Sequence, residues 1–332
     1  MVYALKKYLY KFSLYLTLGV KMKVIVIIPA YNEELNICKV IREIKENVKN
    51  AEVLVINDGS KDKTFERAKE SKADYIINNK QNIGLAQSFK RGLEEALKLG
   101  ADIIVNTDAD FQYNQKQIPN LIKPIVEGKA DIVLTDRSIL SLNHMPLNKK
   151  YGNLIATFVT KLVSGFNVRD AQSGFRAFSR DAALRLNVLS DYTYVQETII
   201  QAVDKRLRIL QMKCDFKKRE HSKSRLIGNI FNYAKRAGLM IVRSYVIYKP
   251  LKALLITAMF PLTIGFLLGL RFLYYYSIGA GRHIQSLILA AILVIIAFQI
   301  IILAFIADTI NANRKINEEV LYRIKKREFS NN

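Results

Sequence analysis

The chain has 332 residues, of which 50% are hydrophobic, and it carries a formal net charge of +22. This length leaves room for one large domain or two ordinary ones with a substantial core. Its two cysteines, Cys38 and Cys214, are too few and too far apart for a disulfide framework or a cysteine metal cluster, which fits a reducing compartment. The positive charge predicts a polyanionic partner, either nucleic acid or an anionic membrane face. Much of it flanks two apolar runs in the C-terminal third, which favours the membrane.

The first segment, residues 1–21, mixes lysines with tyrosines and phenylalanine, as suits a membrane surface. Its longest uncharged run, 12–20, is too short to span a bilayer. We expect an interfacial helix or a dispensable extension. A signal peptide is the competing interpretation, although no clear small-x-small cleavage site follows.

Short β-branched runs then alternate with helical segments. The expected strands are 24–28, 53–56, 75–77, 103–105 and 132–134, and the expected helices run to about 48, from about 61, over 85–99 and over 115–127. Asn32 and Ser60 are the expected N-caps of the first two helices. This order predicts βαβ units and a parallel sheet with right-handed crossovers. Such sheets bind ligands beyond the carboxyl ends of their strands.

The central motif is residues 106–112 (NTDADFQ), which follows the fourth expected strand. Asp108 and Asp110 can both reach one hard cation, and the Gln112 amide supplies a third oxygen. Mg²⁺ or Mn²⁺ takes such ligands and commonly completes its shell with substrate phosphates. An isolated Asp-x-Asp is more often a polar turn.

Other polar residues share this placement after strand ends or at the next helix start, and they favour a nucleotide site over a polar turn: Tyr31, Glu33, Asp58 and Gly84. The site is not a P-loop, because no G-x-x-x-x-G-K-S/T is present, and G-x-G-x-x-G is absent too.

Four motifs together, in order, resemble glycosyltransferase family 2: residues 27–33 (IIPAYNE), 57–64 (NDGSKDKT), 82–84 (NIG) and 108–112 (DADFQ). Within the family the chain is similar to the dolichol-phosphate mannose synthase and polyprenyl-phosphate glycosyltransferase branch over about residues 22–245. The resemblance implies an α/β catalytic domain of the GT-A fold, Rossmann-like with a mostly parallel sheet, over 22–225. It also implies an inverting enzyme that moves a hexose from GDP-mannose or a UDP-sugar to dolichyl or polyprenyl phosphate, with Mg²⁺ or Mn²⁺ at the diphosphate.

Roles carry over from the family by position. Base and ribose contacts would come from Pro29, Tyr31, Glu33 and Asp58, and the wider nucleotide-sugar set adds Gly84, Asp108, Ala109, Asp110, Arg137, Arg219 and Arg225. The metal ligands would be Asp108, Asp110 and Gln112, with Asp108 facing the ribose as much as the metal. Arg137 occupies the position of the family's basic residue near the sugar-phosphate, and a surface arginine is the alternative. The catalytic set would be Asp110, Arg137, Glu197 and Arg219.

Two later segments resemble the family's acceptor side. Residues 170–176 (DAQSGFR) resemble the segment that shapes the sugar and acceptor pocket, which gives roles to Ser173 and Arg176. Residues 219–225 (REHSKSR) resemble a loop that closes on diphosphate and lipid phosphate and adds Ser224 and Arg225, although Ser222 stands where glycine is usual. Glu197 lies where the family carries an acid near the acceptor, or is an ordinary helix-surface glutamate. His144 and His221 lack metal-ligand spacing and are interpreted as loop residues.

The C-terminal third predicts a membrane anchor. Residues 226–249 fit amphipathic interfacial helices, and the uncharged runs 253–270 and 287–307 predict a transmembrane hairpin over 250–308. The positive-inside rule places the catalytic domain and the basic tail, 309–332, on the cytoplasmic side of the cell membrane.

Three rival hypotheses remain open. The chain could extend a lipid-linked or other membrane glycan, could be a retired transferase that only binds nucleotide-sugar, or, on charge alone, could bind nucleic acid, a partner that the motifs disfavour. The oligomeric state is not readable from the sequence.

Overall fold

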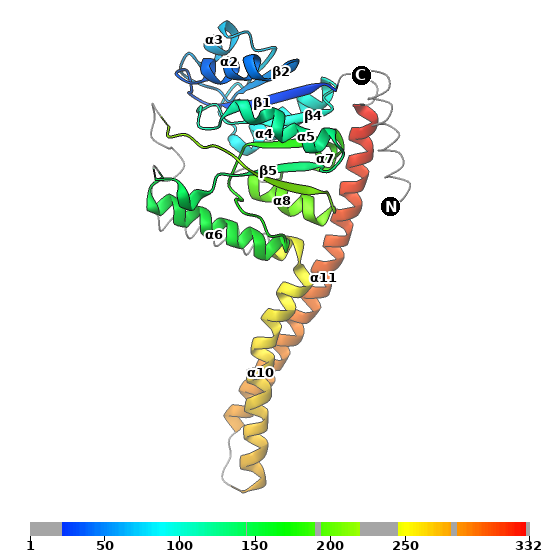
Figure 1. Ribbon diagram of the computed structural model, residues 1–332. Coiled ribbons are helices and arrows are strands. Elements are labelled where there is room, and N and C mark those ends of the chain that lie inside the picture. The colour runs from blue at the N-terminus through cyan, green and yellow to red at the C-terminus, as the bar shows by residue number, and fades with distance from the viewer. Residues whose placement is uncertain (1–21, 144, 190–193, 220–244, 280–283, 330–332) are drawn as a thin grey trace. The chain divides into compact units, whose positions relative to one another are not determined.

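The computed structural model describes residues 22–143, 145–189, 194–219, 245–279 and 284–329 (Figure 1). The chain divides into two compact units. One, here the sheet unit, comprises Met1–Ala234 and Leu321–Asn332, and the other, the hairpin unit, comprises Lys235–Val320. The predictions made for residues 1–21, for most of 226–249, and for His144, His221, Ser224 and Arg225 lie outside the described residues.

A seven-stranded mixed sheet with the order β3-β2-β1-β4-β6-β5-β7 forms the centre of the sheet unit. Only β6 runs antiparallel to its two neighbours, β4 and β5, while the other neighbouring strands are parallel. The strands are β1 (Val24–Ala30), β2 (Ala51–Asn57), β3 (Tyr75–Asn78), β4 (Ile103–Asn106), β5 (Ile132–Asp136), β6 (Arg176–Ser179) and β7 (Ile209–Lys213). The expected α/β fold with a mostly parallel sheet is confirmed, and β6 and β7 are additions to the five expected strands.

The central strands are apolar along their whole length because both faces of the sheet are covered. In β1, Ile25 and Ile27 belong to one core cluster, whereas Val26 and Ile28 belong to the other. Successive side chains of a strand point to opposite faces, so an uninterrupted apolar run feeds two layers at once. Phe89 of α4 (Leu85–Lys98) lies in the first cluster.

The other helices that the structure describes in the sheet unit connect or follow its strands. They are α2 (Ile37–Asn47), α3 (Thr64–Glu70), η1 (Gln115–Gln117), α5 (Ile118–Val126), η2 (Ile139–Ser141), α6 (Leu147–Ser164), α7 (Arg180–Arg185) and α8 (Val195–Asp204).

The predicted caps of the first two helices are wrong, because both side chains make contacts between loops. The Asn32 Oδ1 accepts a hydrogen bond from the Lys61 backbone N–H at 2.8 Å, and the Ser60 Oγ accepts one from the Asn32 N–H at 2.9 Å. Helix α2 therefore begins only at Ile37, and α3 begins at Thr64. These bonds join the loop after β1 to the loop after β2.

Among the described residues, two helices are long and apolar enough to cross a membrane, α10 (Pro250–Ser277) and α11 (Ile284–Glu328), and α11 belongs to the hairpin unit as far as Val320. Four alanines of these helices are buried, Ala258, Ala290, Ala297 and Ala304. A Cβ at Gly265 would lie 3.1 Å from the Ala290 carbonyl oxygen. Such residues let two helix backbones approach closely, as is common between membrane helices.

The end of α11 belongs to the sheet unit, a feature that the expected basic tail did not predict. Phe329 is buried in the first core cluster. The Tyr322 Oη donates a hydrogen bond to the Asp181 Oδ1 at 2.7 Å, and the Arg180 Nη2 donates one to the Phe329 carbonyl oxygen at 2.5 Å. These hydrogen bonds therefore hold the last turns of α11 against α7.

Candidate active site

The candidate site lies at the carboxyl ends of β1, β2 and β4, where three loops meet. Asp58 follows β2 and is buried. Its Oδ1 accepts hydrogen bonds from the Ile83 N–H and the Asn79 Nδ2, both at 2.9 Å, and its Oδ2 accepts one from the Gly84 N–H at 3.0 Å. Asp58, predicted to contact the nucleotide, thus holds the loop that begins α4. Gly84, the residue before α4, presents its N–H to that carboxylate rather than outward.

A cleft of about 450 Å³ opens beside this loop. It is lined mainly by polar side chains from the ends of β1, β2 and β3, among them Tyr31, Asn57, Asp62, Asn78 and Asn82. The predicted nucleotide residue Tyr31 therefore lines a cavity. Pro29 is buried within β1 opposite Ile56 of β2. Gly59 fits the cleft wall because its φ is +67° and a Cβ there would lie 2.5 Å from the Gln81 carbonyl carbon.

The acidic pair follows β4 and is partly buried. Burial raises the pKa of Asp108 to about 7, and the neighbouring Asp110 carboxylate adds to the rise. Burial also raises the pKa of Asp110, opposed mainly by the Arg219 guanidinium. Between them Ala109 is buried. Two carboxylates that repel each other in a poorly solvated place form a site that a cation would stabilise.

The backbone around the pair brings a second chain segment to it. Phe111 has a φ of +60°, a conformation uncommon for a bulky residue, and the Gln112 N–H donates to the Asp110 Oδ1 at 3.2 Å. The Lys217 N–H donates to the Gln112 carbonyl oxygen at 2.7 Å, and the Gln112 Nε2 donates to the Lys217 carbonyl oxygen at 3.1 Å. The segment after β7 is thereby held alongside the acidic loop, two residues before Arg219.

Arg219 reaches two of the predicted acidic residues. Its Nη1 lies 3.8 Å from the Asp110 Oδ2, and its Nη2 forms an ion pair with the Glu33 Oε1. Within the part of the chain that the structure describes, no group accepts a hydrogen bond from its buried Nε. Burial lowers the pKa of Lys149 in α6, and the Arg219 charge lowers it further. The sequence predicted no role for Lys149, because it resembles any lysine at a helix start.

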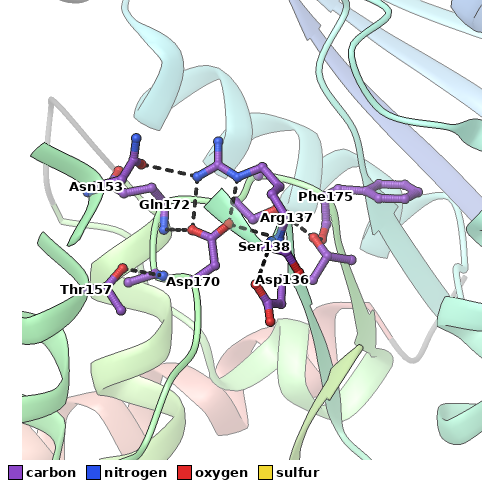
Figure 2. A network of polar contacts seen from close by, with 12 residues as sticks. Asp136, Arg137, Ser138, Asn153, Thr157, Asp170, Gln172 and Phe175 are labelled. Carbon is purple, nitrogen blue, oxygen red and sulfur yellow. Dashed lines mark hydrogen bonds and ion pairs between the residues drawn. The ribbon is translucent and has the colours of Figure 1, made fainter. Parts of the chain in front are cut away.

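Arg137, after β5, forms a buried ion pair rather than lying on the surface (Figure 2). Its Nε and Nη2 donate to the two oxygens of Asp170 at 2.6 and 2.9 Å, and its Nη2 also donates to the Asn153 Oδ1 at 3.2 Å. Asp170 further accepts from the Gln172 N–H at 3.0 Å, and the Arg137 charge keeps its pKa low against the effect of burial. The pair fixes the start of the 170–176 segment.

Arg176 and Ser173, predicted to contact the acceptor, are fully buried. The Arg176 guanidinium donates to the carbonyl oxygens of Ala171, Ser173 and Val195 and to the Thr198 Oγ1. The Ser173 Oγ lies 2.6 Å from the Thr135 Oγ1. Both side chains therefore shape the segment from within, which corrects the predicted direct contact.

Glu197, the predicted acid near the acceptor, lies in the first turn of α8. Its two carboxylate oxygens accept from the Leu189 N–H at 3.1 and 3.2 Å. Its side chain thus holds Leu189, which lies after the end of α7.

Asp108 lies against a second group of residues that sequence reasoning missed. A Cβ at Gly174 would lie 3.0 Å from the Asp108 Oδ1 and 2.9 Å from the Tyr194 Oη, so only glycine fits there. The Asn106 Nδ2 donates to the Gly174 carbonyl oxygen at 2.7 Å and to the Tyr194 Oη at 2.8 Å. Asn106 therefore connects β4 to Gly174 and Tyr194. The one sequence signal for this role is the position of Asn106 at a strand end, two residues before Asp108.

The residues present fit a divalent cation. Asp108 and Asp110 have pKa values raised by burial, and the Arg219 guanidinium already lies beside the pair. Among the described residues no group of three or more His, Cys, Asp and Glu side chains is arranged to hold a metal ion. A cation here would take further ligands from the Gln112 amide or from phosphate oxygens.

Comparisons with known proteins relate the chain to glycosyltransferases. The family model described as Glycosyl transferase family 2 matches residues 25–186. The chain is 36% identical over 210 residues to a UDP-N-acetylglucosamine–dolichyl-phosphate N-acetylglucosaminyltransferase of Methanococcus voltae, which covers 55% of this chain and 81% of that relative. It is 26% identical to an undecaprenyl-phosphate mannosyltransferase of Micrococcus luteus, with 64% of this chain and 91% of the relative covered.

A solved structure shares the fold. It is glucosyl-3-phosphoglycerate synthase from Mycobacterium tuberculosis in complex with Mn²⁺, UDP and glucosyl-3-phosphoglycerate. The TM-score is 0.51 at 21% identity, over 68% of this chain and 79% of that one. This likeness supports the architecture alone.

Proposed function

From the premise that this chain belongs to glycosyl transferase family 2, in its polyprenyl-phosphate branch, we propose that it transfers a sugar from a nucleotide-sugar to a dolichyl or polyprenyl phosphate. The observation that carries the proposal is the meeting of Asp108, Asp110 and Arg219 at the edge of the sheet. Carboxylates for a cation and a guanidinium for phosphate oxygens are the groups that a departing nucleoside diphosphate requires.

The donor would lie across the carboxyl edge of the sheet. Its base and ribose fit the polar cleft beside Tyr31 and Asn57, and its diphosphate extends to Asp110 and Arg219. The Arg219 Nε, which has no hydrogen-bond acceptor among the described residues, can donate to a phosphate oxygen. Asp108, Asp110 and Gln112 would hold Mg²⁺ or Mn²⁺, which supplies positive charge next to the leaving diphosphate when bound.

The acceptor needs little activation. A phosphate monoester is largely doubly ionised near neutral pH because its second pKa is about 6. One of its oxygens can attack the anomeric carbon while the bond from that carbon to the diphosphate breaks, and no proton has to move. Such a single displacement inverts the anomeric configuration. The protein supplies orientation and positive charge from Arg219, whose guanidinium lies beside Asp110.

Membrane anchoring fits a lipid acceptor. Two helices, α10 and α11, are long and apolar enough to span a bilayer. The excess of basic residues around these helices supports a cytoplasmic sheet unit, where soluble nucleotide-sugar is available. A lipid phosphate could then be reached at the same membrane face.

A donor screen tests the proposal. The full-length protein in detergent is given polyprenyl phosphate, Mg²⁺ or Mn²⁺, and one labelled donor at a time from GDP-mannose, UDP-glucose and UDP-N-acetylglucosamine. One donor is expected to place label in the organic phase with the unmodified protein. The Asp110→Asn variant should place no label there with the same donor. A parallel reaction replaces polyprenyl phosphate with a preformed lipid-linked sugar. Label that enters the organic phase only in this parallel reaction would contradict the proposed acceptor.

A further inference from the structure

One face of α6 exposes a continuous row of large apolar side chains. Leu147, Tyr151, Ile155, Phe158 and Leu162 are 69, 64, 52, 65 and 60% exposed. Their spacing of three or four residues places them on one side of the helix, while Gly152, Ala156, Thr160 and Val163 on the other side are buried. Single exposed apolar residues are ordinary, but a contiguous apolar patch marks an interaction surface.

The charges of α6 suit an anionic partner. The helix carries Lys149, Lys150 and Lys161 and no acidic residue. Lysines combined with a row of leucine, isoleucine, tyrosine and phenylalanine are typical of helices that lie in a membrane interface. Anionic lipid headgroups attract such lysines, and the apolar row can enter the boundary of the acyl chains. Two membrane spans in the same chain would keep the sheet unit next to a bilayer.

The inner side of the same helix contacts the candidate site (Figure 2). The Asn153 Oδ1 accepts a hydrogen bond from the Arg137 Nη2 at 3.2 Å. The Thr157 Oγ1 accepts one from the Ala171 N–H at 3.1 Å, next to Asp170. The helix therefore exposes an apolar row on one side and supports the Arg137–Asp170 pair with the other.

We propose that the outer face of α6 docks on the anionic surface of the bilayer, with Tyr151, Ile155 and Phe158 inserted among the lipids. Docking in this position presents a lipid headgroup to the end of the site that α6 supports. The membrane contact stands on the geometry and charge of α6, while the delivery of the headgroup rests on the proposed function.

The absence of tryptophan from the chain allows a direct test. Phe158→Trp in the full-length protein, reconstituted into phosphatidylcholine–phosphatidylglycerol vesicles, gives one fluorophore without background. Lipids brominated in the acyl chain should quench roughly half or more of its emission, because an interfacial helix buries its apolar face about 5–10 Å into the membrane boundary. Leu35→Trp is the matched control, since Leu35 is 59% exposed in the loop before α2, and it should not be quenched.

Two outcomes would overturn the docking proposal. Emission from Phe158→Trp that is blue-shifted but unquenched would show that protein covers the face, either a second copy or another segment of this chain. Quenching no greater than in Leu35→Trp, with emission typical of water, would show that nothing covers it. Neither reading depends on sugar transfer, so the docking proposal and the proposed function can fail separately.

A second variant tests delivery of the headgroup. Ile155→Glu/Phe158→Glu changes two exposed side chains and leaves the core and the Asn153 and Thr157 contacts in place. In vesicles it should raise the KM for polyprenyl phosphate about tenfold or more, because charged residues are repelled from the lipid interior. The KM for the nucleotide-sugar should not change. An unchanged KM for the lipid phosphate would overturn the delivery role.

Discussion

Breaking the Arg137–Asp170 pair should cost more stability than any surface ion pair of this protein. The Asp170 side chain is 1% exposed and that of Arg137 is 9% exposed, and the two share a bidentate contact. Asp170→Ala leaves the guanidinium buried with Asn153 as its remaining partner in the network. Removing one member of a buried pair costs about 3–5 kcal/mol. For a domain of this size about 1 kcal/mol lowers Tm by roughly 2–4 °C, so we expect a fall of about 6–20 °C.

A double-mutant cycle separates the pair from simple loss of packing. Arg137→Met should also destabilise, but Arg137→Met/Asp170→Ala should lose less than the sum, by roughly 1–3 kcal/mol, because no charge is left unpaired. Glu70→Gln is the surface control, since its contact with Arg67 is long, at 3.8 Å, and both side chains are more than half exposed. Its effect should stay below about 1 kcal/mol.

Thermal unfolding of the full-length variants in detergent measures these effects. Donor binding by the folded fraction should be followed in parallel. A Tm for Asp170→Ala within about 2 °C of the unmodified protein would refute the argument, because it corresponds to no more than about 1 kcal/mol. Additive losses in the double variant would also refute it.

Three further changes have expected outcomes. Asp108→Asn should raise the Tm of the metal-free protein at pH 8 while abolishing transfer, because the buried carboxylate, whose pKa is raised to about 7, is charged at that pH and its charge opposes folding. Gly174→Ala should lower kcat, because the new methyl group would displace the Asp108 carboxylate and the Tyr194 Oη. An unchanged kcat would contradict this contact. Phe329→Ala should cost about 3 kcal/mol or more, measurable as a lower Tm, because the ring is buried in the sheet unit.

The parallel strands could be predicted because their signal is local. Residues 24–28 and 103–105 are continuous apolar runs, and burial on both faces of a sheet demands such runs. Strand β6 has the sequence Arg-Ala-Phe-Ser and begins with a fully buried arginine, so no local pattern indicates it. The predicted starts of α2 and α3 were wrong because Asn32 and Ser60 form hydrogen bonds between the two loops. These contacts between distant segments compete with capping of the following helix.

The residues that gather at the candidate site could be predicted from the sequence where their residue types suggest the chemistry. The direction in which a side chain points could not be predicted. The acidic pair and Arg219 do lie together, although about 110 residues separate them in the chain. Asp58 and Arg176 were assigned to ligands, yet both face inward and hold loops. A buried arginine that bonds to backbone carbonyls has the same sequence signature as one that grips phosphate, so only the structure distinguishes them.

Transfer of label into the lipid phase that depends on a divalent cation is the most direct test of the proposed function. With the donor selected by the screen and polyprenyl phosphate as acceptor, the unmodified protein should transfer label with Mg²⁺ or Mn²⁺ and stop when a chelator is added. Asp110→Asn should bind the lipid vesicles normally and transfer at least about a hundredfold more slowly, since the proposed cation beside the leaving diphosphate would lose a carboxylate ligand. Transfer by Asp110→Asn at the unmodified rate would contradict the assignment of this edge of the sheet as the catalytic centre.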